Sequence, residues 1–400
     1  MRRALFIETN FSGVDAVLRC RAARIEPLLV TAGLAGLADK LPAGSLGRLR
    51  AAATIVQVRD PLDEEALAPV AARLRPDAIL SFSQAHTLVA ARLARRLGLR
   101  GADPAAVAAL NDKFAMRGAL ERLGLESVRR LLVRRPEELD GVPQSVGFPF
   151  VVKPTRGFAS VGVAVCRSRR ELARLRHTLA RELLPWIAEE YFEGPLVSVE
   201  TLTLGRGRHQ VWGLSDRALT HGVVEVGSSF PVRPPGWRAA VRHTLACLDG
   251  IGFDLGAAHT ELILTASGPR IVEINARAGG TGHTQMIDAA SGRSVCLDVV
   301  RAHLGLPVEP WTPPARTASR YSFWSARKGV IRALPRAATA RRLEGFSDMW
   351  LFKREGSSHE GLRTNFDLLG QILCVGPDLK RAAALARVAA RTLQGEVRIQ

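Results

Sequence analysis

Two patterns of apolar and polar positions alternate over the first hundred residues, one typical of strands and one typical of helices. Short apolar runs, RRALFIE, IEPLLVTA, ATIVQVRD and DAILSFS, are typical of buried strands. Stretches such as DEEALAPVAARLR and HTLVAARLARRLGL repeat apolar residues at helical spacing. This alternation predicts an open, mostly parallel sheet. We therefore expect a leading α/β domain of Rossmann-like type, although the first strand is not followed by the GxGxxG of a dinucleotide site.

The pattern changes beyond this segment. Residues 103–125, DPAAVAALNDKFAMRGALERLGL, read as one helix, with Asp103 as N-cap and Pro104 in the first helical position. FPFVVKPTRGFASVGVAVCRS predicts two strands joined by a turn rich in small residues, and a helix over 169–184 follows.

Strand-like segments dominate the remaining sequence. WIAEEYFEG, VSVETLTLG and HQVWGLSD precede a predicted helix over 237–249, and a second helix is predicted over 285–304. A Pro-rich link, GLPVEPWTPPAR, leads to a small strand-rich domain with a late helix, LKRAAALARVAARTL. The chain is thus expected to divide into residues 1–105, 106–188, 189–305 and 306–400.

One predicted hairpin, HTELILTASGPRIVEINARAGG, carries polar residues where paired strands should be apolar. Glu261 and Glu273 are equally distant from Ser267, so a turn centred on SGP places them opposite each other, with β-carbons about 5 Å apart. Asn275 and Arg277 follow on the same face, because strand side chains alternate.

Two opposed carboxylates need neutralisation, since like charges facing each other destabilise a sheet. Arg277 can supply part of the charge. Mg²⁺ is better suited, because carboxylate and amide oxygens are its preferred ligands. The alternative is a bulge that shifts the register and turns both glutamates to water.

Composition narrows the classes of partner. A hydrophobic share of 47% excludes a disordered chain. The net charge of +18 suggests nucleic acid, but the arginines are dispersed and the few aromatics do not interleave with basic runs, so we expect none. No apolar run approaches the roughly 18 residues of a membrane helix, so we expect no membrane partner. Scattered cysteines without CxxC, and a start unlike a signal peptide, favour the cytoplasm.

Taken together, these segments resemble an ATP-grasp ligase. The metal-binding pattern of that family is an acidic residue, a dozen residues, then Glu-x-Asn and commonly an Arg, and Glu261, Glu273, Asn275 and Arg277 match it. The resemblance implies an ATP-grasp fold, α/β overall and α+β in its ATP-binding part. It also implies ATP and two Mg²⁺ ions, replaceable by Mn²⁺, as cofactors, with the two glutamates and Asn275 as metal ligands.

The nucleotide site is implied by two further segments. FPFVVKPTRGFASVG is similar to the phosphate-binding strand and mobile loop of the family, and AEEYFEG to the hinge that holds adenine. The family often places a ribose-binding Glu where this chain has Leu196, which makes Glu193 the substitute. The resemblance assigns ATP binding to Lys113, Lys153, Gly157, Ser160, Gly162, Glu189, Glu190, Phe192 and Glu193.

Family members share a first step in which a carboxylate attacks the γ-phosphate of ATP, giving an acyl phosphate and ADP. In most members an amine then displaces phosphate. The resemblance implies that Arg277 stabilises the transferring group and contacts substrate, and that the Gly280 backbone binds the acyl oxygen. RALTHGVVEVGSSFP resembles the segment lining the amino-acid site of L-amino-acid (dipeptide) ligases, so His221 and Glu225 become candidate substrate contacts.

Several alternatives stay open on the sequence alone. The same scaffold activates bicarbonate in biotin carboxylase and in carboxyaminoimidazole ribonucleotide synthetase. An ATP-binding regulatory protein without turnover is a second alternative, although the intact metal pattern opposes it. The implied partners are a small-molecule carboxylate and an amine, whose identities the sequence does not reveal. A homodimer is expected only by analogy with the family.

Overall fold

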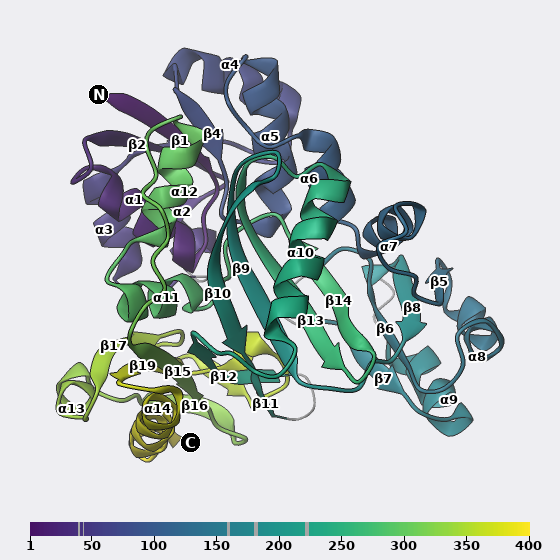
Figure 1. Ribbon diagram of the computed structural model, residues 1–400. Helices are drawn as coiled ribbons and strands as arrows, with labels where there is room; N and C mark the ends of the chain where they lie inside the picture. Colours follow the sequence, from purple (N-terminus) through teal and green to yellow (C-terminus); the bar gives the residue numbers. More distant parts are fainter. Residues whose placement is uncertain (39–40, 43, 158–160, 180–182, 221–223) are drawn as a thin grey trace.

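The computed structural model describes residues 1–38, 41–42, 44–157, 161–179, 183–220 and 224–400. Within these residues the strands form five sheets. Figure 1 shows the large antiparallel sheet at the centre, with the leading domain above and to its left, the third domain below, and a lid sheet at the right. The mixed α/β class predicted from the sequence is confirmed.

The leading domain is a parallel sheet of four strands in the order β3-β2-β1-β4, as the alternating pattern predicted. Its strands are β1 (Arg2–Ile7), β2 (Ile25–Thr31), β3 (Thr54–Gln57) and β4 (Ala78–Leu80). Its helices are α1 (Phe11–Cys20), α2 (Leu34–Ala38), α3 (Ser45–Ala52), α4 (Glu64–Leu74), η1 (Gln84–His86) and α5 (Thr87–Arg96).

The segment 103–125 forms two helices, so the prediction of a single helix is wrong. They are α6 (Pro104–Leu110), capped by Asp103 as predicted, and α7 (Lys113–Arg122). The Asp112 side chain accepts from the backbone N–H groups of Phe114 and Ala115 and so caps the second helix. A side chain that binds its own helix amides favours a helix start over a helix interior. The break leaves Lys113 at the first position of α7.

The lid is an antiparallel sheet in the order β5-β8-β6-β7. Its elements are β5 (Arg130–Val133), η2 (Pro136–Gly141), α8 (Val142–Ser145), β6 (Phe150–Pro154), β7 (Ala164–Cys166), α9 (Arg169–Thr178) and β8 (Trp186–Glu190). The two predicted strands on either side of the small-residue turn are confirmed. Because β8 pairs with both β5 and β6, this sheet extends two residues past the expected boundary at 188.

The central sheet is antiparallel, in the order β10-β9-β13-β14. Its strands are β9 (Leu196–Gly205), β10 (Arg208–Asp216), β13 (Gly256–Thr265) and β14 (Gly268–Asn275), and α10 (Trp237–Ile251) packs against it. The helix predicted over 285–304 is two helices, α11 (His283–Ser291) and α12 (Val295–His303). The break follows from Gly292, which is left-handed at φ +72°, and from Ser294, which caps α12.

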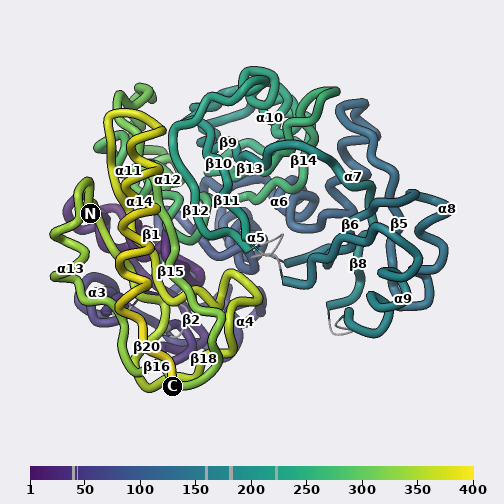
Figure 2. The backbone as a smooth tube through the Cα atoms, turned by 90° about the horizontal axis from the view of Figure 1, so that it is seen from below, coloured from purple at the N-terminus to yellow at the C-terminus, as the bar shows by residue number. Residues whose placement is uncertain are grey.

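The main sheet of the third domain includes two strands that lie earlier in the sequence. Its main sheet runs β11-β12-β15-β19-β17, and a second one runs β18-β16-β20. These two earlier strands are β11 (Ala218–Thr220) and β12 (Val224–Phe230). The other elements are β15 (Thr317–Phe323), β16 (Lys328–Ala333), α13 (Ala337–Arg341), β17 (Phe346–Leu351), β18 (Ser358–Glu360), η4 (Asn365–Asp367), β19 (Gly370–Gly376), α14 (Leu379–Gln394) and β20 (Arg398–Ile399). Strand β12, which carries Glu225, therefore pairs with β15 of the C-terminal segment, and both strands are labelled in Figure 2.

The leading domain and the helices α11 and α12 share one apolar core. Val14 and Val17 of α1 belong to the same buried cluster as Met286 and Val295. A carboxyl group, Asp288, lies inside this interface and accepts from the backbone N–H of Val295 at 2.9 Å. Burial raises the pKa of Asp288 to about 8, against a weaker opposing effect of that hydrogen bond. Asp288 is therefore protonated in the folded protein at neutral pH.

Replacing Asp288 with Asn is expected to stabilise the protein increasingly as pH rises. The unfolded Asp288 loses its proton near its ordinary pKa of 3.8, whereas the folded one holds it to about pH 8, so wild type loses stability across that window. Between pH 5 and pH 7.5 the advantage of the Asn variant should grow by about 3 kcal/mol, measured by urea denaturation.

A matched control is Asp77→Asn. The backbone N–H of Arg3 lowers the pKa of Asp77, so its carboxylate is fully ionised at both pH values and its replacement should cost the same at each. If the difference between Asp288→Asn and wild type were equally independent of pH, the buried carboxyl would be ionised, contrary to the expectation.

Candidate active site

The β13–β14 hairpin brings the two predicted carboxylates together. Glu261 pairs directly with Glu273, as the sequence predicted. The predicted turn position is wrong, however, because β13 ends at Thr265 and β14 begins at Gly268, which leaves Ala266 and Ser267 as the turn. That short turn alone would oppose Glu261 to the residue before Glu273.

A one-residue bulge corrects the register of the hairpin. Leu262 pairs with Ile271, whereas Glu261 pairs with Glu273, so Val272 has no partner across the hairpin. The bulge expected as an alternative is therefore present, but it brings the carboxylates together rather than turning them to water. Val272 also presents its carbonyl oxygen to Lys153 Nζ at 3.1 Å. A bulge that re-aims groups beside a site is a common use of this irregularity.

The Glu273 carboxylate is held by a lysine and an amide. Lys113 Nζ lies 2.9 Å from Oε2, and Asn275 Nδ2 donates to Oε1 at 2.8 Å. Burial disfavours the charge, but the Lys113 ammonium and these hydrogen bonds outweigh it and lower the pKa of Glu273 to about 2. Lys113 reaches this position because it begins α7, and its Nζ also donates to the Gly157 carbonyl at 3.1 Å. The Lys113 ammonium group therefore connects the start of α7, the lid residue Gly157 and the β13–β14 hairpin.

The Glu261 carboxylate is backed by a buried histidine. His259 Nε2 lies 3.2 Å from Glu261 Oε1, and His259 Nδ1 lies 2.7 Å from Glu200 Oε1. Burial opposes charge on the ring, but Glu200 and Glu261 outweigh it and raise the pKa of His259 to about 9. The hydrogen bond from His259 likewise helps to lower the pKa of Glu261 against the effect of burial. Both opposed glutamates are therefore ionised at neutral pH.

These residues fit a hard divalent cation. Glu261 and Glu273 supply ionised carboxylates on one face of the hairpin, and Asn275 adds an amide on the same strand. In the described part of the chain, no three His, Cys, Asp or Glu residues are grouped to hold a metal ion. A set of two carboxylates and an amide is incomplete for Mg²⁺, which commonly takes its remaining ligands from water and substrate phosphates. The donor set therefore fits a cation that arrives with a nucleotide.

Lys153 lies on β6 with its ammonium group buried. Its Nζ is 2.6 Å from Glu189 Oε1, and burial lowers the pKa of Lys153 although Glu189 opposes this. Glu189 is also gripped by Arg117, whose Nε and Nη2 donate to its two oxygens at 2.8 and 3.2 Å. Arg117 Nη1 completes the cluster by donating to Glu126 at 2.7 Å. The cluster joins α7 and the segment after it to the lid strands β6 and β8.

The predicted adenine hinge begins on the last residues of β8, which include Glu189 and Glu190, and continues into the segment after it. Both oxygens of Glu189 have partners inside the protein, and the Glu190 carboxylate binds Arg129, with Nη2 3.1 Å away. The Phe192 ring lies 4.9 Å from the guanidinium of Arg270, and Glu193 beyond it is exposed. The adenine and ribose contacts of these residues stay predictions. If the Glu189 carboxylate is to bind adenine, it must first release Arg117 or Lys153.

The lid loop contributes glycines with left-handed or unusual backbone angles. Gly157 has φ +153° and Gly162 has φ +72°, values that side-chain-bearing residues rarely adopt. A Cβ at Gly162 would lie 2.8 Å from Leu183. The predicted contact Ser160 lies outside the described residues. The phosphate-binding role of this loop stays a prediction.

The segment after Asn275 is fixed from the leading domain. Ser12 Oγ on α1 donates to the Gly279 carbonyl at 2.8 Å. Arg277 Nη1 donates to the Ala278 carbonyl at 2.9 Å and would lie 3.9 Å from a Cβ at Gly280. The structure thus places the Arg277 guanidinium beside Gly280. Their roles toward a substrate stay predictions.

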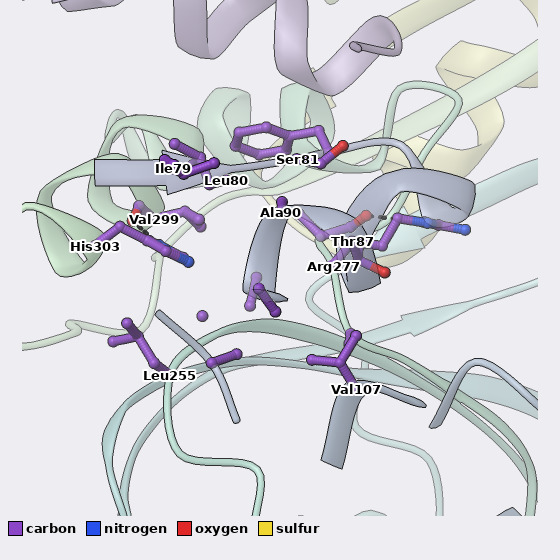
Figure 3. Close-up of a pocket in the computed structure, with 17 residues that line it drawn as sticks. Ile79, Leu80, Ser81, Thr87, Ala90, Val107, Leu255, Arg277, Val299 and His303 are labelled. Carbon is purple, nitrogen blue, oxygen red and sulfur yellow. Dashed lines mark hydrogen bonds between the residues drawn. The ribbon is translucent and has the colours of Figure 1, made fainter. Parts of the chain in front are cut away.

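A small cavity lies behind this segment, against β4, α5 and α12. Arg277, Ala276 and Ala278 line it together with His303 and Thr87 (Figure 3). Its volume is about 40 Å³, enough for two or three water molecules at most. The cavity is therefore too small for a nucleotide or an amino acid.

The predicted substrate contact Glu225 is held by two arginines. Arg217 Nε lies 3.0 Å from one of its oxygens, and Arg320 Nη2 hydrogen-bonds the other. Glu225 itself is partly exposed, with 17% of its side chain accessible. The other predicted contact, His221, lies outside the described residues.

Sequence reasoning missed the charged residues that surround the predicted ones. Two of them, Glu200 and His259, could have been noticed in VSVETLTLG and AAHTELIL, because each is an ionisable residue in a strand-like segment that is otherwise rich in apolar residues. Arg117 and Arg217 lie inside the quoted segments, and Glu126 and Arg320 lie outside them, but no local pattern marks any of the four, and their role in the site is recognisable only in space. The missed residues are Arg117, Glu126, Glu200, Arg217, His259 and Arg320.

Comparison with known proteins identifies the class. Residues 111–281 match the ATP-grasp domain family, and residues 322–398 match the L-amino acid ligase C-terminal domain 2. The chain therefore carries an ATP-grasp domain and, after it, the C-terminal domain 2 of the L-amino acid ligases. The resemblance and the fold predicted from the sequence are confirmed.

Individual relatives support the same branch. The chain is 29% identical to alanine–anticapsin ligase of Bacillus amyloliquefaciens over 50% of its length, and 32% identical to carnosine synthase 1 of Gallus gallus over 61%. It spans only 48% and 29% of those two proteins. The crystal structure of L-amino acid ligase from Bacillus licheniformis superposes with a TM-score of 0.82 at 20% identity, covering 100% of this chain and 98% of that one, which shows the shared fold.

None of the helices that the structure describes combines the length and the apolar character that a membrane crossing needs.

Proposed function

We propose that the chain is an ATP-dependent ligase that activates a carboxylate as an acyl phosphate and joins it to an amine, releasing ADP and phosphate. The observation that carries this proposal is the opposed pair Glu261 and Glu273, ionised and bridged to the lid loop through Lys113. Phosphoryl transfer depends mainly on positioning and on neutralising phosphate charge. A site that gathers carboxylates, an amide and lysines at one face suits that task.

The metal ligands are proposed to be Glu261, Glu273 and Asn275, holding two Mg²⁺ ions for which Mn²⁺ can substitute. The ions supply neutralisation of the phosphate charge. When the nucleotide binds, the Lys113 ammonium group is expected to exchange its contact with Glu273 for a contact with the phosphates. It already lies between the Glu273 carboxylate and the lid loop. Lys153 is expected to reach the same phosphates from β6.

The substrates are proposed to be an amino acid or related carboxylate and an amine. Support comes from the match of the third domain to the L-amino acid ligase family and from relatives named for joining alanine to anticapsin and for making carnosine. Arg277 and Gly280 are the proposed contacts of the reacting acyl group, and Glu225 with His221 the proposed contacts of an amino-acid substrate. A homodimer, assigned by analogy only, can be checked by analytical ultracentrifugation.

The test is the release of ADP and phosphate with Mg²⁺ and ATP when amino acids are offered singly and in pairs. Release that requires two amino acids, together with a product of the coupled mass, supports the proposal. Stimulation by bicarbonate instead would transfer the protein to the carboxylase alternative. ATP binding without release under any of these conditions would favour a regulatory protein.

Lys153→Ala is expected to lower this release at least 100-fold, on the order of the loss found when one charge-stabilising group is removed from an active site. The control is Lys328→Ala on β16, because that lysine is 74% exposed and far from the hairpin in sequence and sheet. Full activity in Lys153→Ala would contradict the assigned phosphate contact.

A further inference from the structure

A chain of charged side chains connects the third domain to the β13–β14 hairpin. Arg320 on β15 binds one oxygen of Glu225 on β12. The other oxygen of Glu225 binds Arg217 Nε at 3.0 Å. Arg217 Nη2 then lies 3.7 Å from Glu261 Oε1. Two arginines and two carboxylates thus alternate in charge from the last domain to a proposed metal ligand.

Both arginines of this chain are buried. The side chains of Arg217 and Arg320 are each 1% exposed. A buried guanidinium is costly unless it is paired with an anion and hydrogen-bonded. Glu225 is the anion that they share, and it gives a separate oxygen to each of them. Arg217 is therefore only partly neutralised by Glu225 and keeps charge to direct toward Glu261.

A second set of contacts ties Arg217 to the same carboxylate. Arg217 Nη2 donates to Ser198 Oγ at 3.1 Å, and Ser198 Oγ donates to Glu200 Oε1 at 2.6 Å. Glu200 holds His259, which reaches Glu261. The position of Arg217 and the orientation of Glu261 are consequently linked by two routes. A change in what holds Arg217 must change how Glu261 is presented to a cation.

We propose that Arg320 is a positioning residue for the metal site. By holding one oxygen of Glu225, it leaves Arg217 shared between Glu225 and Glu261 and so fixes the orientation of the metal-binding carboxylate. The third domain is then a working part of the metal centre, although its own segment of sequence carries no metal ligand. This inference rests on the proposed function in one respect, the assignment of Glu261 as a metal ligand.

The experiment measures the Mg²⁺ dependence of ADP binding by calorimetry, in full-length wild type and in Arg320→Lys. Lysine keeps the charge but lacks the planar fork that can hold one carboxylate oxygen in a fixed direction. Loss of a residue that orients a metal ligand typically lowers metal affinity about 10- to 100-fold. We expect the Mg²⁺ concentration for half-maximal ADP binding to rise about 10-fold, with metal-free ADP binding unchanged. Arg332→Lys, an exposed arginine of the same domain, should match wild type.

Arg320→Gln separates orientation from simple charge. If Arg320 acts only by its positive charge, Gln should tighten Mg²⁺ binding and Lys should leave it unchanged, and that pair of results overturns the proposal. If orientation matters, both variants weaken Mg²⁺ binding. Thermal unfolding of each variant shows whether it is folded. If both Arg320 variants fail to fold, Glu225→Gln provides the test, because releasing Arg217 toward Glu261 should also weaken Mg²⁺ binding, and unchanged Mg²⁺ binding overturns the proposal.

The failure of the proposed function has a different signature. A wild-type protein whose ADP binding does not respond to Mg²⁺ contradicts the metal assignment of Glu261 itself. A wild type that responds, together with an Arg320→Lys variant indistinguishable from it, contradicts only the positioning role of Arg320.

Discussion

Glu273→Gln is expected to reduce ATP-dependent coupling about 1,000-fold at saturating ATP, since each tenfold loss corresponds to about 1.4 kcal/mol and a metal ligand contributes several kcal/mol. The variant removes one of the two opposed carboxylates and the partner of Lys113. The rate of product formation, followed at several Mg²⁺ concentrations, measures the effect. Excess Mg²⁺ should recover only part of the rate, because the neutral amide is a weaker ligand.

The stability of Glu273→Gln should change little although its activity falls. The pair Glu261 and Glu273 places like charges face to face, so removing one charge relieves repulsion while the Lys113 contact is lost. We expect little change in the unfolding midpoint of Glu273→Gln. Glu360→Gln, at a side chain that is 56% exposed on β18, is the control and should keep full activity. A Glu273→Gln enzyme with wild-type turnover would rule out the hairpin as the metal site.

Arg117→Leu is expected to destabilise the protein by about 3–5 kcal/mol, because it removes the partner from two buried carboxylates. Arg117 is 1% exposed and holds Glu126 and Glu189, which are 2% and 4% exposed. Without the arginine, Glu189 keeps Lys153 as a partner but Glu126 keeps only His243 and the backbone N–H of Ile271. Urea denaturation with the linear extrapolation gives the free energy of unfolding.

Two comparisons sharpen this expectation. Arg129→Ala breaks a pair whose arginine is 65% exposed, and such surface pairs contribute about 0–1 kcal/mol. The double variant Arg117→Leu with Glu126→Gln should recover part of the loss, because it removes one unpaired charge. Equal losses in Arg117→Leu and Arg129→Ala would mean that the buried cluster contributes no more than a surface ion pair.

The β13–β14 hairpin shows how much of the site the local sequence pattern could predict. The opposition of Glu261 and Glu273 followed from their equal distance to the turn, and this prediction is confirmed although the assumed turn was displaced. Two local features, a shorter turn and the bulge at Val272, cancelled in the count of residues. Neither is visible in the sequence, because a bulge is selected by what the strand packs against and not by its own residue types.

The prediction of a single helix over 103–125 was wrong for a related reason. Apolar periodicity runs through Asn111 and Asp112 without interruption, so the pattern favours one helix. The Asp112 side chain instead caps a new helix, while the backbone N–H of Lys113 bonds the Thr155 carbonyl of the lid. A contact with a residue more than forty positions away decides between two locally acceptable structures.

By itself, the sequence determined the class of fold, the two strands of the β13–β14 hairpin and the presence of Glu261, Glu273 and Asn275 on them, since these depend on periodicity and residue type within short segments. Tertiary structure alone decided which charges meet. Arg117, Arg217 and Arg320 come from three separate segments, and each is placed by the need to pair a carboxylate away from water. Pairing of buried charge depends on distance in space, which one-dimensional spacing does not contain.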